Sequence, residues 1–128
     1  MKAKTLDKEI KKAILTAQRS EITEYFIYDK LSQSIRDTHN KEILQRISND
    51  ELKHHNFWKG YTHEDVEPDR LKIWIYFLIS RIFGITFGLK LMERGEEQAQ
   101  VTYEGISKSV PAAEDILRDE NEHEKQLL

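Results

Sequence analysis

Apolar side chains recur at steps of three and four residues through nearly the whole of the 128-residue chain. This period places them on one face of a helix, and only five Gly and two Pro interrupt it. The spacing predicts four helical stretches: about Thr5–Arg36, roughly Lys41–Lys59, a long third pattern from Ile75 to Val110, and Pro111 to about Leu128. We therefore expect an all-α fold in which residues 1–128 form one domain.

Acidic and imidazole side chains occupy positions in these apolar stripes that a bundle would bury. The first stripe runs through Ala17 and Tyr28, and the same phase selects Glu21 and Glu24 between them. Across the four stretches, six such residues are in phase: Glu21, Glu51, His54, Glu96, Glu120 and His123. Burying a charge without a partner of opposite charge is prohibitively costly, so we expect these six residues to surround a common partner.

The first and third stretches resemble each other in sequence. The segment Tyr28–Ile35 aligns with Tyr103–Val110, and the same alignment places Glu21 on Glu96. The second and fourth stretches each contain a Glu-x-x-His motif. The chain is thus organised as two copies of a helical hairpin, and each copy supplies one Glu followed by Glu-x-x-His.

This ligand pattern predicts a dinuclear metal site in the core. Residues three apart on a helix are neighbours, so each Glu-x-x-His motif directs two ligands to one place. Two divalent cations neutralise four carboxylates, and carboxylate with imidazole suits iron or manganese. Di-iron bundles combine one Glu from each of two helices with Glu-x-x-His from the other two. The alternative is a helical interaction domain without metal, in which these carboxylates pair with Lys or Arg.

An additional carboxylate ligand is predicted among Glu93, Glu24 and Glu97. Glu93 is favoured because it lies three residues before Glu96, on the same face of the helix. The remaining histidines are expected outside the ligand set, with His55 at the surface or beside the ligands and His39 and His63 in connections.

Composition excludes several other classes of function. The formal net charge of −3 offers no basic surface to a nucleic acid, and the lack of Cys excludes disulfides and cysteine-ligated metals. The charged N-terminus has no apolar signal-peptide core. The most apolar segment, Leu71–Leu91, contains Arg81 and is interpreted as a buried or interfacial helix, not a membrane span. We expect a cytoplasmic protein, or the soluble domain of a membrane protein.

Four motifs contain most of these candidate ligands: Ser20-Glu21-Ile-Thr-Glu-Tyr25-Phe-Ile-Tyr28, Asp50-Glu51-Leu-Lys-His54, Met92-Glu93-Arg-Gly-Glu96-Glu97 and Asp119-Glu120-Asn-Glu-His123-Glu. Together they resemble the rubrerythrin branch of the ferritin-like di-iron superfamily, over about residues 10–128. The segment Gly88–Glu97 is especially similar to rubrerythrin-type domains fused to vacuolar-iron-transporter-like membrane domains. In those fusions the membrane part follows the fourth helix.

The resemblance implies a ferritin-like four-helix bundle that binds two iron ions, with manganese or zinc as substitutes. The implied metal ligands are Glu21, Glu51, His54, Glu93, Glu96, Glu120 and His123. No catalytic residue beyond these ligands and no organic cofactor site is expected. The implied activity is oxidation of ferrous iron by O2 or H2O2, as in a ferroxidase or a rubrerythrin-like peroxidase. The alternative is an iron-sensing or iron-delivery domain of a membrane iron transporter, with little turnover.

Full rubrerythrins carry a rubredoxin module with Cys-ligated iron, and this chain has no Cys. That departure favours a ferroxidase or iron-delivery role over peroxidase turnover, because the usual internal electron supply is missing.

The sequence allows two ways in which the chain could connect the second and third helices. The segment Leu71–Phe83 either forms a crossover helix within one subunit, or continues into the third helix as one long helix that reaches a second subunit. In both cases its apolar surplus predicts a homodimer, with or without a domain swap. The fourth stripe is still in phase at Leu128, so we expect the natural chain to continue, with a membrane iron-transporter domain as its partner.

Overall fold

The computed structural model of the protein describes residues 8–92, 118–119 and 122. Within these ranges the chain forms helices α1 (Lys8–Ser34), α2 (Thr38–Thr62) and α3 (Arg70–Phe83), and residues 85–92 are helical again. These ranges contain no strand, so the prediction of an all-α fold is confirmed for the part of the chain that the structure describes. Five candidate ligands lie outside it: Glu93, Glu96, Glu97, Glu120 and His123.

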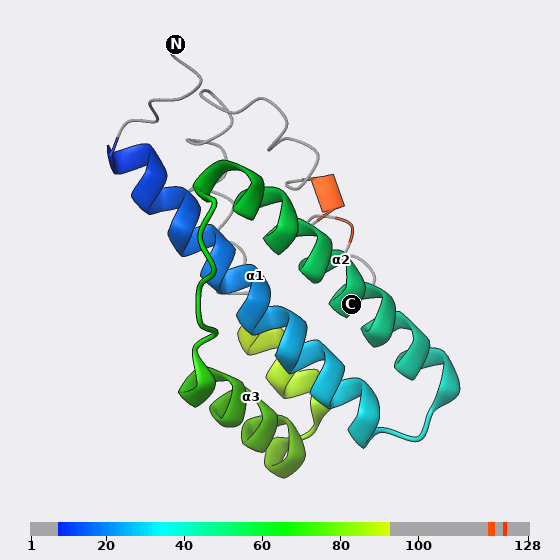
Figure 1. The fold of residues 1–128 in the computed structure, drawn as a ribbon. Coiled ribbons are helices and arrows are strands. Elements are labelled where there is room, and N and C mark those ends of the chain that lie inside the picture. The colour runs from blue at the N-terminus through cyan, green and yellow to red at the C-terminus, as the bar shows by residue number, and fades with distance from the viewer. Residues whose placement is uncertain (1–7, 93–117, 120–121, 123–128) are drawn as a thin grey trace.

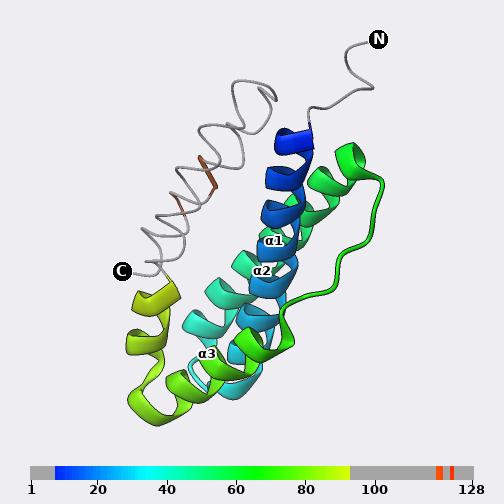
Figure 2. The same ribbon diagram turned by 90° about the vertical axis from the view of Figure 1, so that its left-hand side faces the viewer.

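Helices α1 and α2 lie side by side and antiparallel along most of their length (Figures 1 and 2). Helix α2 begins at Thr38, three residues before the predicted start, because Asp37 serves as its N-cap. The Asp37 side chain accepts a hydrogen bond from the backbone N–H of His39 at 3.1 Å. At the other end, His63 adopts the left-handed conformation (φ 56°) and donates its N–H to the carbonyl of Lys59.

The hairpin core consists of the apolar stripes that periodicity predicts. Buried members of these stripes are Ile14, Ala17, Tyr28, Leu31, Leu44, Ile47 and Trp58. The in-phase residues Glu21, Glu51 and His54 are buried with them. The stripe predictions for the first two helices are therefore confirmed for these residues, whereas Ile10, Glu24 and Ile35 of the first stripe are only half-buried.

The connection from α2 to α3 spans residues 63–69 and runs back along α1 (Figure 1). It is held by hydrogen bonds from the Gln18 side chain to the carbonyl of Glu64 (2.7 Å) and from the backbone N–H of Asp69 to the Thr23 hydroxyl (2.9 Å). In the same connection, the hydrogen bond and charge of Lys59 hold the pKa of the exposed Asp65 carboxyl below its usual range. The chain thereby reaches the level of Thr23, about midway along α1, before α3 begins.

Helix α3 buries a different face from the one that periodicity predicted. Ile75, Leu78 and Ile82 were expected in the buried stripe, but they are 44%, 51% and 70% exposed. Instead, Ile73 and Phe77 pack against the core of the hairpin. The prediction was wrong because α3 has apolar residues on the predicted face and also on the opposite face, which contains Ile73, Tyr76 and Phe77, so hydropathy alone does not decide which face turns inwards.

A break at Gly84 separates α3 from residues 85–92 (Figure 2). Gly84 has a φ angle of 100°, a backbone conformation that residues other than Gly rarely adopt. The chain is therefore not one continuous helix through this position. No helix in the part of the chain that the structure describes has the length and apolarity needed to cross a bilayer.

The turn at Gly84 brings Gly88 directly against Ser80 of α3. A Cβ atom added at Gly88 would lie 1.9 Å from Oγ of Ser80 and 3.2 Å from its Cα. We expect Gly88→Ala to lower the free energy of unfolding by about 1–3 kcal/mol, the usual cost of overpacking. Urea denaturation followed by circular dichroism measures this change.

The matched control for this prediction is Gly60→Ala, because nothing lies within 4 Å of a Cβ at this position in α2. The control should raise stability by roughly 0.5–1 kcal/mol, since Ala is the better helix former. Adding Ser80→Ala to Gly88→Ala should recover part of the loss. Equal effects at Gly88 and Gly60 would contradict the close approach.

Candidate metal centre

Three of the predicted ligands meet in the middle of the α1–α2 hairpin. Glu21 lies on α1, and Glu51 and His54 lie one turn apart on the facing side of α2. One ligand atom from each residue lies within 4.8 Å of those of the other two. Both carboxylates are fully buried, and His54 is 4% exposed.

The imidazole of His54 links three acidic side chains. Its Nδ1 atom lies 2.9 Å from Oε2 of Glu21 and 3.4 Å from Oε1 of Glu51. Its Nε2 atom lies 2.9 Å from Oδ2 of Asp119, a distance at which a ring N–H donates to a carboxylate. The ring is thus fixed at one edge by Asp119, while its other nitrogen faces the two buried carboxylates.

This arrangement fits a bound divalent cation. A metal-ligating His usually donates its second ring N–H to a carboxylate, which fixes the tautomer and orientation of the ring. With Nε2–H directed at Asp119, the Nδ1 lone pair can ligate a metal beside Glu21 and Glu51.

Asp119 was not predicted as a site residue, although the sequence contains a signal for it. An Asp stands directly before the Glu of both Glu-x-x-His motifs, at Asp50 and Asp119. The side chain of Asp119 is 53% exposed, unlike the cluster that it contacts through His54. Because the predicted stripe of this stretch runs through Ile116, Glu120 and His123, a search restricted to that stripe does not select Asp119.

A second buried polar group, centred on Gln18, borders the cluster. Its amide oxygen accepts a hydrogen bond from the Thr62 hydroxyl (2.8 Å), and its NH2 group faces Nε2 of His55 (3.4 Å) as well as the carbonyl of Glu64. His55 is only 8% exposed, so of the two predicted positions the one at the surface is excluded and the one beside the ligands remains. It does not belong to the metal-ligand cluster. Sequence reasoning missed Gln18 because a single amide in a helix carries no periodic signal.

The other candidate residues of the described ranges lie away from the cluster. Glu24 is half-buried on α1 and is not one of the three clustered residues. His39 and His63 are both exposed; His63 lies in the connection after α2, as predicted, whereas His39 lies in the first turn of α2 and not in a connection. Whether Glu93 or Glu97 serves as an additional ligand stays a prediction, because both lie outside the described residues.

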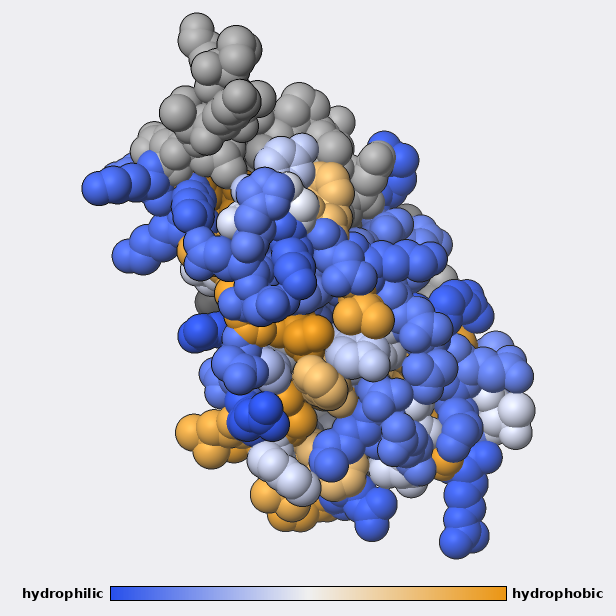
Figure 3. Space-filling view, viewed as in Figure 1, coloured by the Kyte–Doolittle hydropathy of each residue, from blue (hydrophilic) through white to orange (hydrophobic). Residues whose placement is uncertain are grey.

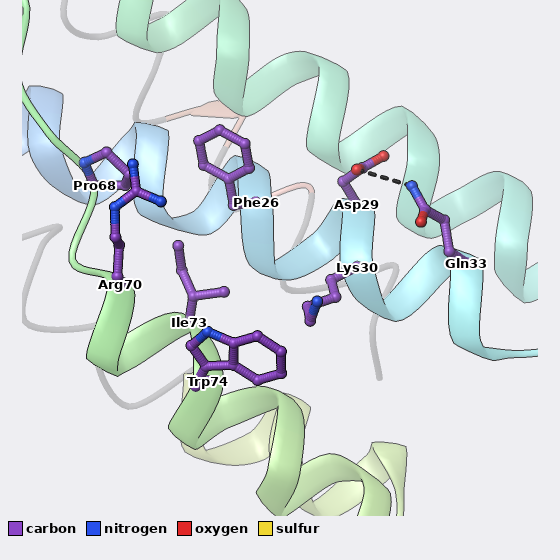
Figure 4. A pocket seen from close by; sticks show the side chains of 8 residues that line it. All are labelled: Phe26, Asp29, Lys30, Gln33, Pro68, Arg70, Ile73 and Trp74. Atoms are coloured by element: carbon purple, nitrogen blue, oxygen red, sulfur yellow. Dashed lines mark hydrogen bonds between the residues drawn. The ribbon is translucent and has the colours of Figure 1, made fainter.

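A pocket of about 280 Å³ lies between α1 and α3, away from the cluster (Figure 4). Its walls are formed by Phe26, Asp29, Lys30, Gln33, Pro68, Arg70, Ile73 and Trp74. Asp29 accepts a hydrogen bond from the Gln33 amide at 3.0 Å, and Nζ of Lys30 lies 4.2 Å from the centre of the Trp74 ring. No member of the carboxylate–imidazole cluster lines this pocket.

Comparisons with protein-family models, with curated proteins and with solved structures give no match to this chain. Its function is therefore argued from the residues of the site.

Replacing His54 tests whether the imidazole offsets the buried carboxylates. In the presence of a chelator, His54→Ala should lower the free energy of unfolding by about 3–5 kcal/mol, the cost of removing one partner from a buried charged group. The control is His39→Ala, an exposed position where a change within about 0.5 kcal/mol is expected. Urea denaturation of both variants provides the comparison, and equal stabilities would contradict a charged, buried cluster.

Proposed function

We propose that this chain is a non-haem di-iron carboxylate protein of ferritin-like architecture, which binds ferrous iron and oxidises it with O2 or H2O2. The observation that supports this most strongly is the buried cluster of Glu21, Glu51 and His54, with Asp119 on the far nitrogen of the imidazole. A core that buries two carboxylates beside one imidazole is suited to a cation with carboxylate and nitrogen ligands.

In this proposal the first hairpin holds one iron ion and the second hairpin holds the other. The internal repeat assigns Glu96, Glu120 and His123 to the second ion, with Glu93 as the additional carboxylate. Two ferrous ions give up two electrons, which with two protons reduce one O2 to H2O2 or one H2O2 to two waters. The residues of this chain bind the ions, hold the ligand geometry and exclude bulk water.

The proposed architecture assigns α3 to the crossover between the hairpins. The support is that the connection 63–69 returns along α1 and that α3 packs on the core of the first hairpin. The break at Gly84 then allows residues 85–92 to start the third helix of the bundle in a new direction. The bundle is thus formed within one subunit in this proposal.

Anaerobic addition of ferrous iron, followed by O2 or H2O2, tests the proposed activity. We expect two ferrous ions to bind per chain and near-ultraviolet ferric absorbance to develop after the oxidant is added. Glu51→Ala should abolish most of this signal, because it removes a fully buried ligand. Glu42→Gln is the matched control on an exposed face of α2 and should leave the signal unchanged.

Thermal unfolding with and without ferrous iron separates this proposal from an interaction domain without metal. Free ferrous iron at 100 times the Kd of a site should stabilise the folded protein by about 2.7 kcal/mol. The Glu51→Ala and Glu120→Ala variants should lose this stabilisation. Fewer than two bound metals with no ferric signal would overturn the proposal. Two bound ions without oxidation would restrict it to iron binding or sensing.

The contact between Asp119 and His54 provides a further prediction. Asp119→Asn should weaken ferrous-iron binding by roughly 10- to 100-fold, because the carboxylate that orients the imidazole is lost. Glu122→Gln, at an exposed position three residues further along, is the control. Anaerobic titration with a competing chromophoric chelator measures both affinities. Equal affinities would show that Asp119 does not position the ligand.

A further inference from the structure

Helix α3 presents an apolar surface to solvent along its whole length. Leu71, Ile75, Leu78 and Ile82 follow one another at steps of four, three and four, so they form a single row. Together with neighbouring aromatic residues, this row makes up what we call the outer face of α3, to which Phe87 of residues 85–92 is added: Leu71, Trp74, Ile75, Leu78, Ile82, Phe83 and Phe87. Figure 3 shows hydrophobic residues gathered at the lower left of the molecule, over α3.

The protein's own core does not require this face. The opposite side of α3 already packs inwards through Ile73, Tyr76 and Phe77, and Ser80 is buried there. On the outer face, Leu71, Ile82 and Phe83 are 71%, 70% and 66% exposed. A contiguous apolar surface of this kind marks a binding surface.

The charges on the segment that forms the outer face are positive, and acidic residues lie only at its N-terminal edge, where Asp69 caps α3 and Glu67 lies 3.9 Å from Arg70. Residues 70–92 contain Arg70, Lys72, Arg81 and Lys90 and no acidic residue, a charge of +4. Because the whole chain carries −3, subtracting +4 leaves −7 for all other residues. At 100° per residue, Lys72 lies on one side of the apolar row, and Arg70 and Arg81 lie on the other. Cations that flank an apolar row are typical of a helix lying in a membrane interface.

The contacts of Trp74 agree with this interpretation. Trp74 is 53% exposed at the edge where α3 meets α1, and the ammonium group of Lys30 lies 4.2 Å from the centre of its ring (Figure 4). An indole with a cation beside it, at the boundary between apolar and polar surface, suits the headgroup region of a bilayer. Lys30 adds a further positive charge next to the outer face.

A second copy of the chain is a poorer occupant of this face. A two-fold dimer pairs the same patch of both subunits, so it would bring the cations of residues 70–92 together with no acidic residue there to pair them. An anionic lipid surface has the complementary charge and accepts the apolar row. We propose that the outer face of α3 docks the protein on the surface of a bilayer that contains anionic lipids. This proposal does not depend on the metal centre.

Co-sedimentation of the full chain with vesicles tests this proposal. Vesicles that contain phosphatidylglycerol should bind the chain at least tenfold more strongly than pure phosphatidylcholine, and high salt should weaken the binding. Tryptophan emission should shift to the blue on binding. Trp74→Phe should keep the binding and lose the shift, because the other tryptophan, Trp58, is already fully buried.

Two variants and one control locate the contact. The double variant Leu78→Gln/Ile82→Gln, at exposed positions, should reduce vesicle binding at least tenfold, and Arg81→Gln should reduce only the binding that depends on anionic lipid. Tyr61→Ser removes an exposed aromatic residue of α2 outside the face and should change nothing. Circular dichroism confirms that each variant keeps its helices.

Two results would overturn the proposal. The first is equal or no binding to the two kinds of vesicle. The second is a dimer by light scattering that the double variant converts to the 15.2 kDa monomer, which would assign the face to a second copy of the chain.

Discussion

The structure depends on the burial of two carboxylates and an imidazole at the centre of a two-helix interface. Glu21, Glu51 and His54 occupy positions where an apolar side chain would add to the stability of the hairpin. Replacing such buried ionic groups with apolar residues is often neutral or stabilising, so burial of this kind is weak as a device for stability. A function that needs these charges together explains the arrangement better than folding does, and cation binding is the function that their chemistry supports.

Periodicity was sufficient to predict the first hairpin and its polar centre. In α1 and α2 the buried stripe alternates with exposed charged residues. The difference in hydropathy between the two faces of each helix therefore defines which face turns inwards. This contrast selected Glu21, Glu51 and His54 together with their neighbours Ala17 and Ile47. It also explains why the ends of α2 were placed less well: capping by Asp37 and the left-handed turn at His63 depend on backbone geometry, not on hydropathy.

The same reasoning failed for α3, where no charged face stands opposite the apolar one. Helix α3 has apolar residues on two opposite faces, so its inward face was decided by packing against the hairpin and by the direction in which the chain arrives from residue 69. Asp119 and Gln18 were missed for a different reason. Asp119 contacts His54, and Gln18 contacts His55, Thr62 and the carbonyl of Glu64; such contacts between distant segments have no counterpart in local spacing.

The hairpin divides into an apolar half and a polar half, and α3 belongs to the first. Ile27, Leu31 and Leu44 form a core near the α1–α2 turn, and Ile73 and Phe77 of α3 pack against that core. The other half contains the cluster and Gln18, where hydrophobic burial is interrupted by polar side chains. Because apolar burial is the main favourable term in folding, the half covered by α3 can hold the helices in register while the polar half keeps its charges.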